Sequence, residues 1–101
     1  MRGIVYGSTF EKAKTQLEKI IEDYKKIGIE VSEGYGLRIA HNSIDVNFTN
    51  GDYWTAVRAS ESSRGRACNI AYIDHDIDPE IIYCVIKPTI KSYPYQAHRY
   101  Y

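Results

Sequence analysis

The chain has 101 residues, of which 44% are hydrophobic and 26% are charged, and its thirteen basic residues balance its thirteen acidic ones. This length and composition indicate one soluble globular domain and exclude a multidomain enzyme. No apolar run approaches the ~18 to 20 residues that a membrane-spanning helix needs, and the short apolar start of the chain does not suggest a signal peptide. We therefore expect a cytoplasmic protein with no membrane partner. Its zero net charge provides no overall attraction to nucleic acid.

The first part of the chain predicts a strand followed by a long helix. Residues Met1 to Tyr6 are typical of a short buried strand. Ser8 followed by Glu11 predicts a capping box, in which the hydroxyl and the carboxylate each bond an otherwise unpaired amide. The amphipathic helix, over about residues 9–27, has apolar residues at steps of three and four: Ala13, Leu17, Ile20, Ile21, Tyr24 and Ile27. Gly28 is typical of the left-handed residue that follows a helix.

The middle of the chain alternates between apolar and polar residues, as strands do. Extended segments from Leu37 to Phe48 and from Tyr53 to Val57 flank Asn50-Gly51. This dipeptide predicts a hairpin with a type I′ turn, in which both central residues have positive φ. The run 69–73 has no clean alternation, which is typical of a central buried strand, and it ends at Asp74.

The C-terminal part of the chain predicts a short second helix and a tail. Asp78-Pro79-Glu80 is typical of a helix start, with Asp as the N-cap and Pro at the first helical position, and the helix covers about residues 79–87. We expect a single α/β domain with a mixed sheet over residues 1–88. Residues 89–101 form a basic, tyrosine-rich tail, which either covers an edge strand or binds a partner.

Several motifs in the middle of the chain resemble the ATPase domain of phage large terminase subunits. The family's F-x-N-G-S hairpin is similar to Phe48-Thr49-Asn50-Gly51-Asp52. Its A-S-x-x-x-x-R-G loop is similar to Arg58-Ala59-Ser60 and Ser63-Arg64-Gly65-Arg66, and its Walker B strand is similar to Ala71-Tyr72-Ile73-Asp74. Residues 4–13 resemble the strand and helix that follow the family's P-loop helix. The resemblance covers roughly residues 3 to 88. It implies a partial P-loop-ATPase-like core in a small phage-encoded protein.

The sequence departs from that family at the residues that carry catalysis. The chain has no GxxxxGK[ST] motif, whose amides and lysine hold nucleotide phosphates. His75 follows Asp74 at the position where the family has the glutamate that activates water. We therefore expect a non-catalytic protein that does not hydrolyse ATP and uses no cofactor.

Asp74 and Asp76 are the candidate metal ligands, with His75 between them. They follow the predicted central strand, and α/β folds place sites at such strand ends. Their oxygens are suited to Mg²⁺ or Mn²⁺, and a bound ion would indicate a metal-dependent phosphate-processing enzyme. In the alternative interpretation Asp74 is structural, and His75 and Asp76 face solvent.

The candidate binding residues combine aromatic rings with positive charge, as interfaces with proteins and with single-stranded nucleic acid both do. They are Arg64, Arg66, Trp54, Tyr93, Tyr95, Arg99 and Tyr100. The two loop arginines are suited to phosphate contact, or they pair with a nearby carboxylate and fix the loop. We expect a phage-encoded accessory protein that binds a host or phage protein, with inhibition of a host enzyme or defence system as one possible role. The alternative is a nucleic-acid-binding module related to DNA packaging, and a homo-oligomer is compatible with either.

Overall fold

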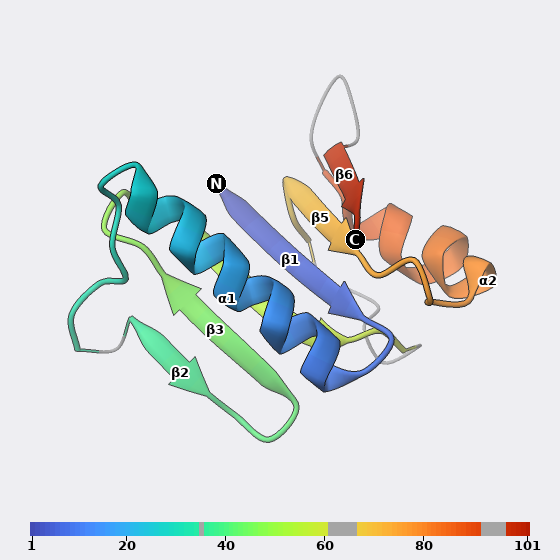
Figure 1. The fold of residues 1–101 in the computed structure, drawn as a ribbon. Coiled ribbons are helices and arrows are strands. Elements are labelled where there is room, and N and C mark those ends of the chain that lie inside the picture. The colour runs from blue at the N-terminus through green and yellow to red at the C-terminus, as the bar shows by residue number, and fades with distance from the viewer. Residues whose placement is uncertain (35, 61–66, 92–96) are drawn as a thin grey trace.

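The structure is a computed structural model that describes residues 1–34, 36–60, 67–91 and 97–101. Within these residues one mixed sheet has the strand order β2-β3-β4-β1-β5-β6 (Figure 1). The neighbouring pairs β4–β1, β1–β5 and β5–β6 are parallel, whereas β2–β3 and β3–β4 are antiparallel. The strands are β1 (Arg2–Gly7), β2 (Leu37–Ile39), β3 (Ser43–Asn47), β4 (Tyr53–Arg58), β5 (Ile70–Ile73) and β6 (Ala97–Tyr100).

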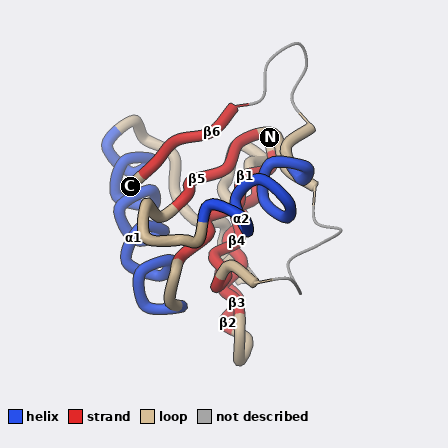
Figure 2. The backbone as a smooth tube through the Cα atoms, turned by 90° about the vertical axis from the view of Figure 1, so that its right-hand side faces the viewer, coloured by secondary structure: helices blue, strands red, loops and turns tan. Residues whose placement is uncertain are grey.

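Helical segments cover both faces of the sheet, so the expected α/β class is confirmed (Figure 2). Helix α1 (Phe10–Lys26) packs over β4 and β1. The other face carries α2 (Pro79–Ile81), a π-helical turn η2 (Ile82–Ile86) and a 3₁₀ turn η3 (Lys87–Thr89). The predicted N-cap is confirmed, since the Asp78 carboxylate accepts a bond from the Glu80 amide at 2.9 Å. No described helix is long and apolar enough to span a membrane.

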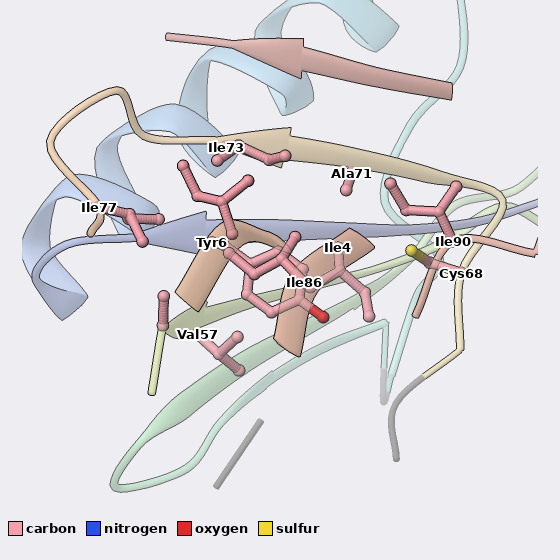
Figure 3. Packing of buried hydrophobic residues seen from close by; sticks show 11 residues of the cluster. Ile4, Tyr6, Val57, Cys68, Ala71, Ile73, Ile77, Ile86 and Ile90 are labelled. Atoms are coloured by element: carbon pink, nitrogen blue, oxygen red, sulfur yellow. The ribbon is translucent and has the colours of Figure 1, made fainter. Parts of the chain in front are cut away.

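Alternate residues of β1 belong to two separate cores. Ile4 and Tyr6 pack with Ile86 of η2 on one face (Figure 3). Val5 packs with Leu17 of α1 on the other face. All five side chains are buried, because β1 lies between β4 and β5 and is covered from both sides. Strand β5 is likewise internal, as its lack of alternation predicts.

The start of α1 differs from the predicted capping box. The N-cap is Thr9, whose hydroxyl accepts a bond from the Lys12 amide at 3.2 Å. The Ser8 hydroxyl instead donates to the Asp74 carboxylate at 2.5 Å. The capping prediction was wrong because the helix begins one residue later than expected, with Thr9 in the capping position, and Ser8 lies outside it against the carboxylate that follows β5. At the other end Gly28 has φ +83°, as predicted, and the preceding Ile27 is exposed.

The hairpin between β3 and β4 is confirmed, but its turn is not type I′. Among the described residues positive φ occurs only at glycines, so within the turn Gly51 has it (φ +92°) and Asn50 does not. The Gly51 amide donates to the Phe48 carbonyl and the Phe48 amide to the Asp52 carbonyl. The Asn50 side chain accepts a bond from the Asp52 amide at 3.0 Å, which stabilises this longer loop.

The end of the chain is part of the sheet, so the expected boundary after residue 88 does not separate it from the domain. Strand β6 pairs with β5 in parallel, with Ile73 opposite Tyr100. The amide of Lys91 also donates to the carbonyl of Cys68 at 2.7 Å. The described residues of the tail therefore cover a strand edge, which was one of the two expected roles.

Candidate functional site

The carboxyl ends of the parallel strands meet at one edge of the sheet. Ser8 follows β1 there, Asp74 follows β5, and Tyr101 follows β6. A pocket of about 280 Å³ opens between α1 and these strand ends. Its lining residues are Glu11, Lys12, Thr15, Gln16, Lys19, Asp74, His75 and Tyr101. This is the place where open α/β sheets bind ligands, so its groups are candidates for chemistry.

Asp74 is the most buried carboxylate of this edge, with a side chain only 1% exposed. One oxygen accepts the Ser8 amide at 2.8 Å and the Ser8 hydroxyl at 2.5 Å, and the other accepts the Asp76 amide at 3.0 Å. Burial acts to raise the pKa of Asp74, but these hydrogen bonds and the charge of Lys12 outweigh it and lower the pKa to about 2. Asp74 is therefore ionised and joins the ends of β1 and β5.

Lys12 places its ammonium between the two candidate metal ligands. Its Nζ lies 3.6 Å from Asp74 Oδ1 and forms a close ion pair with the Asp76 carboxylate. The hydrogen bond to Asp76 is the main reason that the pKa of Lys12 is raised. The structure thus brings Asp74 and Asp76 together, as the metal hypothesis requires, but a cation of the chain itself already lies beside both.

His75 completes the group at the surface. Its exposed ring donates from Nδ1 to the Tyr101 carbonyl at 2.6 Å, and its Nε2 lies 3.3 Å from Asp76 Oδ1. One ligand atom from each of Asp74, His75 and Asp76 lies within 4.8 Å of the others. His75 and Asp76 are exposed, as the alternative interpretation expects, but both also have partners within the chain. The residues that pair with them, Lys12 and Tyr101, come from distant parts of the chain.

The predicted binding residues do not form one surface. Trp54 is only 3% exposed, and its Nε1 donates to the Tyr24 hydroxyl at 3.0 Å, so the prediction of Trp54 as a binding residue was wrong. Arg99 and Tyr100 are exposed, but neighbouring residues of a strand project from opposite faces of the sheet. The other four residues lie outside the described part of the chain: Arg64, Arg66, Tyr93 and Tyr95.

A second candidate site, which the sequence analysis did not identify, is the outermost strand β2. Leu37 and Ile39 are 51% and 69% exposed, although their alternation was interpreted as that of an ordinary strand. They pair with Val46 and Ile44, which are buried. Helix α1 packs over β4 and β1, and β2 lies at the end of the sheet beyond this helix (Figure 1), which leaves Leu37 and Ile39 uncovered.

The backbone of β2 also offers hydrogen-bonding groups on its outer side. The Asn47 amide donates to the Gly36 carbonyl at 2.7 Å, and the Ala40 amide donates to the Ser43 carbonyl at 2.8 Å. Bonding residues alternate in an antiparallel pair, so the amides and carbonyls of Leu37 and Ile39 point away from β3. Within the described residues no strand pairs with this outer side.

The opposite face of this part of the sheet is polar. Arg38 lies opposite Asp45 of β3, and Asp45 accepts a bond from the Thr55 hydroxyl at 2.7 Å. Arg38 also lines an open groove of about 640 Å³, together with Tyr53. No ion pair joins Arg38 to another residue of the described ranges. A guanidinium therefore lies beside the unpaired backbone of β2.

No protein-family model matches the chain, and no match is found among curated proteins or among solved structures. Proposals about its function therefore rest on its own residues and their geometry.

Proposed function

We propose that this protein acts by binding another polypeptide, without catalysis, and that the partner adds a strand to the outer edge of β2. The observation that carries the proposal is the exposure of Leu37 and Ile39 on a strand whose outward amides and carbonyls lack a described partner. Edge strands are commonly protected by charge, proline, bulges or covering loops. An edge that combines apolar side chains with free backbone groups is typical of strand addition.

The carboxyl edge of the sheet supports the non-catalytic part of the proposal. Both oxygens of Asp74 accept hydrogen bonds from the chain, and Lys12 lies beside Asp74 and Asp76. A carboxylate that holds a metal ion or takes a proton needs an oxygen directed at the ligand. Here the Asp74 oxygens join the ends of β1 and β5 instead, and the Lys12 ammonium already pairs with the Asp76 carboxylate.

The position of Asp74 supports the finer proposal of a partial P-loop-ATPase-like core. Residues 71–74 resemble the family's Walker B strand, and Asp74 follows β5 at the carboxyl edge of the sheet, beside the parallel strand β1. We therefore propose a small phage-encoded accessory protein whose partner is a host or phage protein, with inhibition as the expected consequence of binding.

The test is a pull-down from host lysate with two matched variants. Ile39→Pro removes an outward amide that β3 does not use, so the sheet should stay intact while strand addition is blocked. Ile27→Ser changes an equally exposed isoleucine at the end of α1. We expect wild type and Ile27→Ser to capture the same protein and Ile39→Pro to lose it.

Two outcomes would contradict the proposal. Capture of the same protein by Ile39→Pro would exclude the β2 edge. Retention of nucleic acid alone, falling steeply between low and physiological salt, would favour the nucleic-acid alternative, because phosphate contacts release counterions.

A further inference from the structure

The pairing between β2 and β3 shows which kind of strand β2 accepts. Leu37 lies opposite Val46, Arg38 opposite Asp45, and Ile39 opposite Ile44. The apolar residues of this antiparallel pair share one face of the sheet, and Arg38 and Asp45 share the other. On its inner side β2 is thus paired with an apolar–acidic–apolar triplet.

The outer side of β2 presents the same three side chains to any strand that pairs with it. Side chains directly opposite each other in a sheet lie on the same face, so the partner's central residue would lie beside Arg38. On the outer side Arg38 occupies a position without ladder hydrogen bonds, since its amide and carbonyl point toward β3. Cross-strand side chains are closest at such positions.

The charge of Arg38 is available to that partner. No residue in the described ranges forms an ion pair with Arg38. Its cross-strand neighbour Asp45 accepts a hydrogen bond from the Thr55 hydroxyl instead. An acidic residue opposite Arg38 would be stabilised, whereas a basic one would be repelled. The same reasoning disfavours a second copy of the chain paired symmetrically about Arg38, because two guanidinium groups would then face each other.

We infer that the partner supplies an antiparallel strand with an apolar–acidic–apolar triplet, chemically like Ile44-Asp45-Val46, whose acid lies opposite Arg38. This inference rests on the proposed function, since it names the class of strand that the β2 edge would bind. Backbone bonds to Leu37 and Ile39 hold the strand, and Arg38 selects its central residue.

The experiment titrates the full chain with a capped peptide that copies residues 42–48 and with the same peptide carrying Asp45→Lys. We expect wild type to bind the Asp peptide at least about fivefold more tightly than the Lys peptide. Arg38→Glu should reverse this preference. The matched control Lys19→Glu makes the same charge change at an exposed position of α1 and should leave the preference unchanged.

Ile39→Pro separates failure of the inference from failure of the proposed function. This variant should bind neither peptide, because the outer edge is blocked while the bonds to β3 remain. Equal binding of both peptides to wild type, lost in Ile39→Pro, would overturn the acid preference and leave strand addition standing. Peptide binding that survives in Ile39→Pro would overturn strand addition at this edge. If wild type binds neither peptide, the inference is overturned. The proposed function is then decided by the pull-down from host lysate.

Discussion

Replacing Asp74 by Asn tests whether this carboxylate stabilises the junction between β1 and β5. The substitution keeps the shape of the side chain but removes its charge and one acceptor. Ser8 donates two hydrogen bonds to one oxygen of Asp74, so an Asn side chain with its nitrogen at that position would leave the Ser8 amide without an acceptor. In the opposite orientation the nitrogen would face the Asp76 amide and Lys12, which are themselves donors. Either orientation costs hydrogen bonds in a buried place.

The expected magnitude follows from the pKa of Asp74. Its ordinary value is 3.8, and the folded protein lowers it to about 2. This difference corresponds to about 2 kcal/mol of stability at neutral pH. With the unsatisfied donor added, we expect Asp74→Asn to lower the free energy of unfolding by about 3 kcal/mol, which lowers the Tm by at least about 10 °C.

The pH dependence identifies the charge as the source of this stability. Since the folded-state pKa is depressed, the stabilisation is fully present above the unfolded pKa of 3.8 and is lost as the pH falls toward about 2. Denaturant titrations of wild type and Asp74→Asn should therefore converge over that window. Asp76→Asn is the matched control, because Asp76 is half exposed and its solvent-screened ion pair with Lys12 should contribute little to stability. A difference in the free energy of unfolding between wild type and Asp74→Asn that stays constant over this pH range would refute the reasoning.

Three further predictions concern the core and the absence of catalysis. Leu17→Asp places a charge in the buried stripe of α1 and should cost several kcal/mol, so its circular dichroism should be that of an unfolded chain, whereas the exposed Ile27→Lys should stay folded. Purified protein should not turn over ATP in a phosphate-release assay, because the chain lacks the P-loop lysine, and turnover that disappears in Asp74→Ala would show the opposite. Calorimetric titration with Mn²⁺ should give no binding heat, because the Lys12 ammonium already lies beside both Asp74 and Asp76 and repels a second cation. A heat that Asp76→Asn abolishes would restore the metal-dependent alternative.

Features that depend on a few neighbouring residues could be predicted from the sequence. The amphipathic stripe of α1, the N-cap at Asp78, Gly28 after the helix and the hairpin around Gly51 all depend on contacts within a few positions. The internal position of β5 and the carboxylate at its end followed from its unbroken apolar run. Periodicity and capping depend on residues close together in the chain, so they can be predicted from a single sequence.

The order of the strands in the sheet decided which residues are exposed and which are paired. The local sequence pattern does not specify that order. Leu37 and Ile39 alternate like any half-buried strand, and only their place at the end of the sheet leaves them uncovered. Trp54 is buried because α1 packs across β4, and Ser8 bonds Asp74 because β1 and β5 are neighbours. Each of these contacts joins residues far apart in the chain. Burial and pairing are properties of the assembled sheet, and the same short motif is exposed at its edge and buried at its centre.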